Sequence, residues 1–309
     1  MMQQGALNVR FHEEAGSHLD LVGQKGVLVR FTYDSHVPKP TWTHLYTLSG
    51  DLLTLHRPFD HLHHRGMMLT WSDVNGFNFW EEHRGPELSA SIIWRRWLDR
   101  FAGRDEAWVA AELEWPDPTG RPLLQQRLAF GASLLPGNDA AWLFQVDAVL
   151  QALDRPVSFR TPPVYNGLGL RLARSMNVKA RILNSLGGLG EEGTRGIPAV
   201  WCDYSGHLDD GGGEAGVTVM SHPRNDRHPV AFHTLTKQMA FISAAPTYAQ
   251  GKDLAPGQAW PLSYGVVVHQ GTPAAETCAA WAAEFSRRES LLRNVYLSDV
   301  LRAAGVPVG

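Results

Sequence analysis

Residues 107–115 read Ala-Trp-Val-Ala-Ala-Glu-Leu-Glu-Trp, and this stretch alternates in character along its length. One set of alternate positions is entirely apolar, consisting of Val109, Ala111, Leu113 and Trp115. The opposite set carries the acidic residues Glu112 and Glu114. Because successive side chains of a strand point to opposite faces, the stretch predicts a β-strand with one face in a core.

The same alternation recurs through the chain. In residues 142–150 the apolar face carries Trp142, Phe144, Val146, Ala148 and Leu150, while Gln145 and Asp147 point the other way. Further strands are predicted at 27–33, 52–55, 67–71, 91–98, 125–131, 217–221, 239–244 and 263–269. Turn sequences separate them at 116–117, 136–139, 210–213 and 256–257. The pattern predicts an all-β fold, a large antiparallel β-sandwich formed by residues 1–309 as a single domain.

One helix is expected, near the C-terminus. Thr272 is suited to cap it and Pro273 to occupy its first position, while Cys278, Trp281 and Phe285 recur at helical spacing. The predicted helix covers about residues 273–290.

Composition narrows the class of protein. The chain has 309 residues and a formal net charge of -3, which argues against a broad surface for nucleic acid. Its two cysteines, Cys202 and Cys278, are too far apart to form a metal-binding pair, and a reduced protein is the simpler interpretation. The first 16 residues lack the features of a signal peptide, and no apolar run is long enough to span a membrane. We therefore expect a cytoplasmic protein that binds neither nucleic acid nor membranes.

Residues 57–66, Arg-Pro-Phe-Asp-His-Leu-His-His-Arg-Gly, concentrate titratable side chains between a proline and a glycine. Those two residues argue against a helix. In an extended backbone His61, His63 and Arg65 would share one side, with His64 on the other. Such a density of titratable groups favours a functional site over a solvated loop.

Two kinds of chemistry suit this segment. His61 and His63 could chelate one divalent metal ion, with Asp60 as a third ligand or as a partner that fixes an imidazole. Alternatively, His61, His63 or His64 could act as a general acid or base, because imidazole titrates near neutral pH. Arg65 could hold a carboxylate or stabilise a developing negative charge. The sequence leaves the presence of a metal open.

An aromatic segment follows the histidines. Asn75-Gly76 predicts a hairpin turn, and Trp71 and Trp80 lie on either side of it. These rings could belong to the edge of a core, or they could stack on the face of a sugar.

Other polar residues are weaker candidates. Arg171 alternates with two leucines and would point away from their face. Asp203 lies in the segment Trp-Cys-Asp-Tyr-Ser-Gly at 201–206, and His222 and Asn225 lie in Ser-His-Pro-Arg-Asn at 221–225.

Taken in order, five segments resemble the bacterial DUF6807 proteins, which often carry the label "methane oxygenase PmoA". The segments are 58–66, 74–80, 169–171, 201–206 and 216–225, and Asp-His-Leu-His-His-Arg-Gly at 60–66 is the most specific of them. The resemblance covers roughly residues 30–270. The particulate methane oxygenase is a membrane complex, whereas this chain contains no membrane span.

The resemblance implies a fold like the β-supersandwich of galactose mutarotases. It also implies a soluble protein, whose relatives often lie beside genes of sugar oxidoreductases and isomerases. It supplies no established catalytic residues, so the roles that follow are hypotheses from the residues themselves.

Three functions are left open. The first is a carbohydrate-active lyase, epimerase or hydrolase, with a small carbohydrate as its partner. In it His61, His63 or His64 moves a proton, and Arg65 and Arg171 hold oxygens or stabilise an enediolate-like charge. Asp203 and His222 form an opposing acid–base pair. Trp71 and Trp80 stack on the sugar, and the further substrate-binding candidates are Asp60, Asn75 and Asn225. The second is a metal-dependent hydrolase or oxygenase with histidine ligands. The third is a carbohydrate-binding protein without chemistry.

Overall fold

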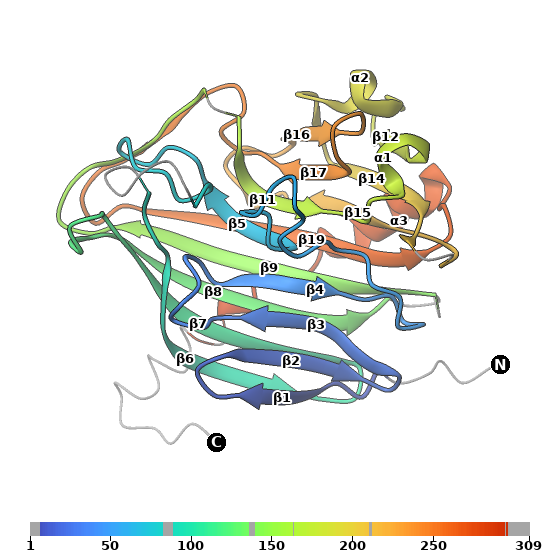
Figure 1. Ribbon diagram of the computed structural model, residues 1–309, viewed down its shortest axis with the longest axis horizontal. Helices are drawn as coiled ribbons and strands as arrows, with labels where there is room; N and C mark the ends of the chain where they lie inside the picture. Colours follow the sequence, from blue (N-terminus) through green and yellow to red (C-terminus); the bar gives the residue numbers. More distant parts are fainter. Residues whose placement is uncertain are drawn as a thin grey trace.

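The computed structural model describes residues 7–82, 89–135, 140–162, 164–209, 212–293 and 295. Two large sheets stack on each other, as Figure 1 shows. The nine-stranded sheet contains, in spatial order, β1 (Arg10–Glu14), β2 (His18–Gly23), β3 (Gly26–Thr32), β4 (Thr41–Leu45), β5 (Met67–Trp71), β11 (Asn166–Arg171), β17 (Phe241–Ala244), β16 (Val230–Leu235) and β13 (Pro198–Ala199).

The eight-stranded sheet contains, in spatial order, β12 (Arg181–Asn184), β14 (Trp201–His207), β15 (Glu214–Ser221), β19 (Ala259–Gln270), β9 (Ala141–Ala152), β8 (Pro122–Leu134), β7 (Glu106–Pro116) and β6 (Ile93–Ala102). A short ribbon pairs β10 (Val157–Phe159) with β18 (Lys252–Leu254). All of these strand pairings are antiparallel. The predicted all-β antiparallel sandwich is confirmed.

The core lies between the two sheets and is built as the alternation predicts. Val109, Ala111, Leu113 and Trp115 of β7 are buried in the same cluster as Phe31 of β3 and Trp42 of β4. Apolar side chains on the two inner faces interdigitate, so each strand contributes every second residue to the core.

The outer face of the eight-stranded sheet is also covered, which the sequence did not indicate. Gln145 and Asp147 point away from the core as predicted, yet both are buried. Gln145 Nε2 donates to the carbonyl of Glu289 at 2.8 Å, and the amide of Leu291 donates to Asp147 Oδ2 at 2.9 Å. The C-terminal segment therefore packs on this face and supplies partners for the polar groups.

Helices whose bounds lie within the described residues include α1 (Met176–Lys179), α2 (Gly190–Thr194) and α3 (Ala275–Phe285). The predicted C-terminal helix exists, but it begins later and ends earlier than expected. Its cap is Ala274, and Thr272 instead donates to Glu214 Oε2 at 3.2 Å. Cys278, Trp281 and Phe285 are buried against the eight-stranded sheet. Within the described residues, no helix combines the length and apolar character that crossing a membrane requires.

One predicted strand does not form. In residues 52–55 Leu52 bridges Tyr46, whereas Thr54 bridges Leu172. Since these two alternate residues bridge different segments, no continuous ladder can build up. The turn predicted at 136–139 lies outside the described residues, as do the first two residues of the turn predicted at 210–213.

Candidate functional site

The histidine loop, residues 57–64, lies within the segment between β4 and β5 and is closed at its base. His56 and Arg65 on either side of it form an antiparallel bridge. Within the loop a turn brings the amide of His64 to the carbonyl of His61 at 2.9 Å. The extended backbone considered from the sequence, with His64 on the opposite side from the other histidines, is not the one that forms.

This turn gathers the three imidazoles into one cluster. The ring centroids are 5.6 Å apart for His61 and His63, 4.9 Å for His61 and His64, and 4.5 Å for His63 and His64. The loop lies over the outer face of the nine-stranded sheet, in front of β5 and β11 in Figure 1.

Gly66 fixes the exit of the loop into β5. Its φ angle is +78°, and a Cβ atom built there would clash with the carbonyl oxygen of Trp42 and lie 2.6 Å from that of Thr43. We therefore expect Gly66→Ala to lower the free energy of unfolding by at least about 1–3 kcal/mol, because both conformation and space oppose the methyl group. Urea unfolding measures this. Gly76→Ala in the exposed hairpin, with φ +87° but open space, separates the cost of conformation from the cost of the clash.

Asp60 is held between a buried arginine and a histidine. Arg171 Nη2 donates to Asp60 Oδ2 at 2.6 Å, and His61 Nδ1 lies 3.1 Å from the same oxygen. Burial acts to raise the pKa of Asp60, but the hydrogen bonds from Arg171 and His61 outweigh it and lower the pKa to about 2. The carboxylate is therefore ionised at neutral pH, and it orients His61 so that Nε2 is available to another molecule.

His64 is the buried member of the cluster. Its ring stacks between those of His61 and Phe241, with the Phe241 centroid at 5.4 Å. Burial, together with the nearby His63 and Arg171, lowers the pKa of His64 to about 2, so the ring is neutral. Arg171 Nη1 lies 3.5 Å from His64 Nδ1, and because a guanidinium only donates, the proton of His64 is assigned to Nε2.

A hollow of about 60 Å³ opens beside these rings. It is lined by His61, His63, His64, Trp80, Glu81, Tyr165, Leu235, Met239 and Phe241. Burial lowers the pKa of His63 to about 4, and Lys39 acts in the same direction. The neutral imidazoles of His63 and His64 thus face an aromatic-lined space next to the carboxyl side chain of Glu81.

Beneath the loop lies a buried charge cluster formed by Lys39, Arg65 and Glu82. Arg65 donates to both carboxylate oxygens of Glu82, at 2.6 and 3.0 Å, and Lys39 Nζ donates to Glu82 Oε1 at 3.2 Å. Lys39 Nζ also donates to the carbonyl of Trp80 at 2.8 Å. The structure thus places Arg65 under the site as a support for the loop, with its guanidinium already engaged.

Several lining residues were missed by the sequence analysis. Glu81 directly follows the candidate Trp80, and Phe241 alternates with Ala240 and Ile242 in the strand predicted at 239–244. The sequence therefore gave a weak indication that these two residues could line the site. Tyr165 and Met239 had none. His233 on β16 lies behind this wall, with its ring centroid 5.7 Å from Tyr165 and 6.1 Å from Phe241. It is 1% exposed, and neither ring nitrogen has a hydrogen-bond partner.

Two candidates from the aromatic segment lie elsewhere. Trp71 is fully buried in the core, where its Nε1 donates to Thr247 Oγ1 at 3.0 Å. Asn75 shapes the hairpin turn, with φ 55°, and donates to the carbonyl of Pro156 at 3.1 Å. Trp80 is the aromatic residue of this segment that reaches the hollow.

Asp203, His222 and Asn225 are not brought to the histidine loop. Asp203 is on the outer face of the eight-stranded sheet, where Oδ1 lies 3.0 Å from His269 Nε2. The ring of His222 packs edge-on against Phe285 of α3 at 5.1 Å. Asn225 donates to the carbonyl of Ser263 at 2.9 Å. The opposing acid–base pair expected from the sequence is absent here, because these side chains and the loop lie on opposite sides of the sandwich.

The histidine loop does not offer a ready three-ligand metal geometry. In the described part of the chain, one group of His, Cys, Asp or Glu side chains brings three ligand atoms within 4.8 Å of one another, and it does not include His61 or His63. That group is on β1 and β2.

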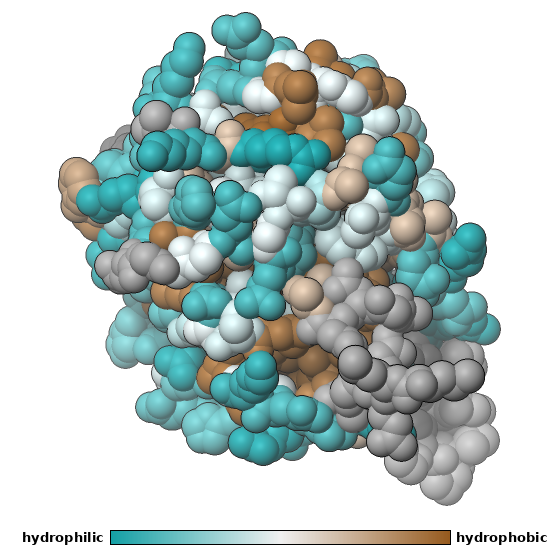
Figure 2. Space-filling view, turned by 90° about the vertical axis from the view of Figure 1, so that its right-hand side faces the viewer, coloured by the Kyte–Doolittle hydropathy of each residue, from teal (hydrophilic) through white to brown (hydrophobic). Residues whose placement is uncertain are grey.

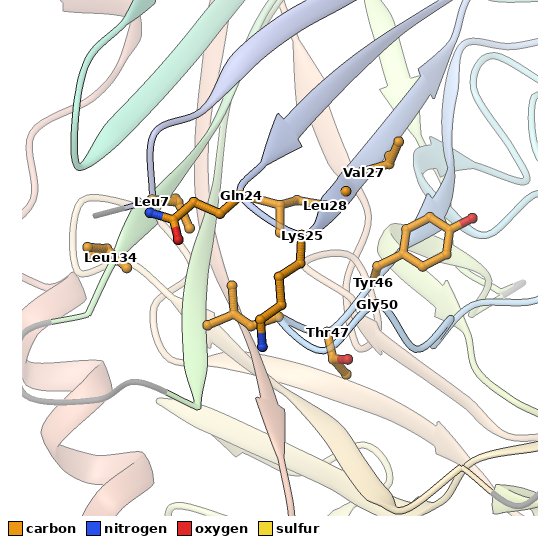
Figure 3. A pocket seen from close by; sticks show the side chains of 11 residues that line it. Leu7, Gln24, Lys25, Val27, Leu28, Tyr46, Thr47, Gly50 and Leu134 are labelled. Carbon is orange, nitrogen blue, oxygen red and sulfur yellow. The ribbon is translucent and has the colours of Figure 1, made fainter. Parts of the chain in front are cut away.

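A larger hollow of about 480 Å³ opens at the end of the sandwich, and Figure 3 shows its lining side chains. Its walls include Lys25, Leu28, Tyr46 and Leu134, with no imidazole or carboxyl group. Figure 2 shows this end of the molecule, where apolar residues gather among hydrophilic ones. The lining offers no acid–base couple, so the smaller hollow is the better candidate for chemistry.

Comparison with solved structures gives distant likenesses. A galactose mutarotase related enzyme from Lactobacillus acidophilus is 8% identical, with a TM-score of 0.35, and the match covers 85% of this chain and 98% of that one. A galactose 1-epimerase from the same organism is 9% identical, with a TM-score of 0.38 over 86% and 100% of the two chains. An aldose epimerase homologue from C. elegans is 8% identical, with a TM-score of 0.33 over 85% and 100%.

None of these three descriptions names a methane oxygenase. No curated protein matches the chain. The family described as "Family of unknown function (DUF6807)" matches residues 19–283. Because that match covers most of the sequence, the chain belongs to the DUF6807 family.

Proposed function

We propose that the hollow at the histidine loop is the active site of an enzyme that transfers protons on a small polyhydroxylated molecule, a sugar or a sugar derivative. The reaction class is an epimerisation, lyase or related step that begins with removal of a proton from carbon or from a hydroxyl group. His61 is the general acid–base residue, and His63 and His64 are neutral neighbours.

The observation that carries the proposal is the chain Arg171–Asp60–His61. A buried guanidinium fixes the carboxylate at 2.6 Å, and the carboxylate lies 3.1 Å from His61 Nδ1. A carboxylate that holds one imidazole nitrogen leaves the other to accept and return a proton. His61 is also partly exposed, so substrate can reach it.

The lining of the hollow supports a sugar-like molecule as substrate. Trp80 and Tyr165 stack with their centroids 6.1 Å apart and both line the hollow. Tyr165 is 39% exposed and offers its ring at the rim, whereas Trp80 is 1% exposed and forms a buried wall. Aromatic faces suit the apolar C–H patches of sugars, whereas imidazole and carboxyl groups suit their hydroxyls. A volume of about 60 Å³ admits a carbonyl or hydroxymethyl end, with the rest of the molecule over the exposed rim.

A test uses proton exchange, which does not require the natural substrate. The purified protein is incubated in D₂O with a panel of aldoses, ketoses and sugar acids, and ¹H NMR follows loss of carbon-bound protons and changes in anomeric exchange. With a sugar that responds, we expect His61→Gln to reduce the rate about 100-fold or more, the usual contribution of a general base.

His36→Gln is the matched control, because His36 is an exposed histidine outside the loop. It should leave the rate unchanged. Equal rates for wild type and His61→Gln would contradict the proposal. Sugar binding without exchange in any member of the panel would favour a non-catalytic binding protein instead.

A further inference from the structure

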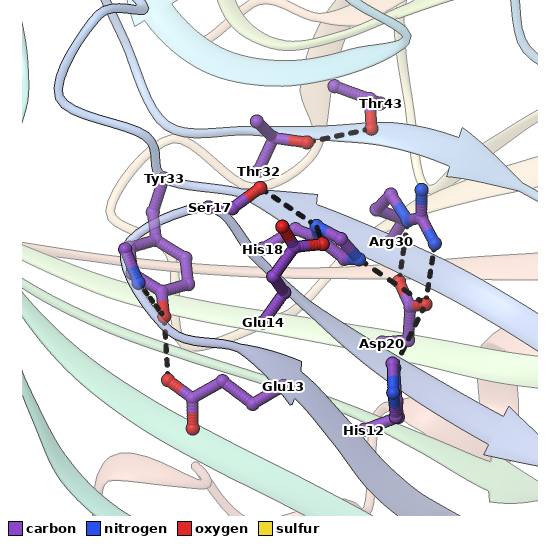
Figure 4. Close-up of polar contacts among 11 residues, drawn as sticks. His12, Glu13, Glu14, Ser17, His18, Asp20, Arg30, Thr32, Tyr33 and Thr43 are labelled. Atoms are coloured by element: carbon purple, nitrogen blue, oxygen red, sulfur yellow. Dashed lines mark hydrogen bonds and ion pairs between the residues drawn. The ribbon is translucent and has the colours of Figure 1, made fainter.

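The edge of the nine-stranded sheet holds a second cluster of histidines, far in sequence from the loop. His12 on β1 is the cross-strand partner of Asp20 on β2, and His18 lies two residues before Asp20 on the same strand. All three side chains therefore share one face of the β1–β2 hairpin. Figure 4 shows both imidazoles directed at the one carboxylate.

The three potential ligand atoms converge without bonding one another. His12 Nδ1 lies 3.9 Å and His18 Nε2 lies 3.8 Å from Asp20 Oδ2, and all three atoms lie within 4.8 Å of one another. These separations are too long for hydrogen bonds. Ligands bound to one Zn²⁺ at about 2.0–2.2 Å lie at most about 4.4 Å apart, so a small inward movement would let all three bind.

The orientation of His18 is set from its other side. Ser17 Oγ lies 3.0 Å from His18 Nδ1, and Glu14 Oε2 lies 3.7 Å from the same nitrogen. A ring nitrogen held in this way leaves Nε2 directed at Asp20, the arrangement that metal-binding histidines commonly show. His18 and Asp20 are buried, whereas His12 is exposed, so an ion here would keep open positions toward solvent.

Arg30 would compete with a metal ion for the carboxylate of Asp20. Its Nε and Nη2 donate to the two oxygens of Asp20, each at 2.8 Å. Each carboxylate oxygen has a second lone pair, so the ion pair leaves Oδ2 able to bind a cation on the side of the imidazoles. The positive guanidinium nevertheless opposes a cation a few ångströms away and lowers the affinity.

We propose that His12, His18 and Asp20 form a binding site for a divalent transition-metal ion, with two nitrogen ligands and one oxygen ligand suited to Zn²⁺. This set differs from the histidine loop in residues and strands, although both lie on the outer face of the nine-stranded sheet. The site does not depend on the proposed enzymatic function.

Calorimetric titration of the untagged, chelator-treated full-length protein with ZnCl₂ tests the proposal. We expect one Zn²⁺ per chain, with affinity reduced about tenfold or more in His12→Ala, because a ligand is lost. His12 is exposed, so this variant should stay folded, and circular dichroism checks it. His36→Ala should bind as wild type does, and Arg30→Gln should bind more tightly.

Two outcomes would overturn the proposal. One is wild-type protein that binds no Zn²⁺. The other is Zn²⁺ binding that survives His12→Ala but disappears in His61→Gln, which would assign the ion to the histidine loop. Titration with CoCl₂ gives an independent measure, because the visible absorption of bound Co²⁺ should change in His12→Ala.

Discussion

Glu82→Gln is expected to lower the free energy of unfolding by about 3–5 kcal/mol, because it removes the partner of two buried cations. The side chains of Lys39, Arg65 and Glu82 are 2%, 7% and 6% exposed. In wild type the carboxylate accepts three hydrogen bonds from the two cations. The amide that replaces it carries no charge and turns a donor toward one of them. Urea unfolding followed by tryptophan fluorescence measures the loss.

Two further variants identify the cause. Glu112→Gln breaks an exposed pair with Arg96, whose N···O distance is 3.2 Å, and should cost about 0–1 kcal/mol. Lys39→Met combined with Glu82→Gln restores the cluster of Lys39, Arg65 and Glu82 to its original net charge. It should regain part of the lost stability. A Glu82→Gln protein as stable as Glu112→Gln would rule out the buried cluster as a support of the loop.

Stability is also expected to fall steeply as the pH drops from about 6.5 to 4. Burial lowers the pKa of His63, His222 and His233 to about 4, and burial with neighbouring charges lowers that of His64 to about 2. In this window the unfolded chain binds protons that the folded chain excludes, so acid favours unfolding. Each fully buried histidine contributes at most about 1.4 kcal/mol per pH unit.

His233→Phe isolates one of these contributions. The ring of His233 is surrounded by Tyr165, Phe241 and Tyr248, and its nitrogens have no partners, so phenylalanine suits the site. The variant should show a shallower dependence of unfolding free energy on pH between 6.5 and 4. Equal slopes for wild type and His233→Phe would refute the assignment, and His36→Ala serves as the unchanged control.

Carboxyl groups add their own pH dependence. Burial acts to raise the pKa of Glu82, but the hydrogen bond from Arg65 and the charge of Lys39 outweigh it and lower the pKa, so its stabilisation begins to be lost at the acid end of this window. The pKa of Asp60 is lowered to about 2, so its stabilisation is lost only below about pH 4. Burial raises the pKa of Asp147, which therefore favours the folded state at lower pH. The carboxyl contributions cancel when the pH dependence of the unfolding free energy is compared between wild type and His233→Phe. They do not cancel in the slope of either protein alone.

The strands that the sequence predicted best are those with one consistent face. Residues 67–71 were predicted as a strand and form β5, and residues 107–115 form most of β7. The strand predicted at 52–55 does not form because Leu52 and Thr54 bridge two different segments of the chain. The alternation of apolar and polar residues indicates which face of a strand is buried. It does not indicate which strand pairs with it.

Some of the predicted site residues meet in the structure and others do not. The sequence singled out Asp60, the three histidines of the loop, Arg171 and Trp80, and these meet. It also singled out Asp203 and His222, which lie on the far side of the other sheet. Arg171, Asp203 and His222 were all weak candidates with a similar local signal, and chemistry alone cannot separate the one that reaches the loop from the two that do not. The alternation of Arg171 with Leu170 and Leu172 correctly predicted that its side chain points away from theirs. Both leucines are buried in the core between the sheets.

The sequence by itself determined the class of fold and the chemical nature of the site, since alternation of side chains and a concentration of imidazoles are both local properties. Only the tertiary structure decided which polar residues meet. Tyr165 and Phe241 reach the loop, and His233 lies behind them, through pairing of β5, β11, β17 and β16 across long stretches of chain. Strand order depends on the packing of two whole sheets, and no short segment of sequence contains that information.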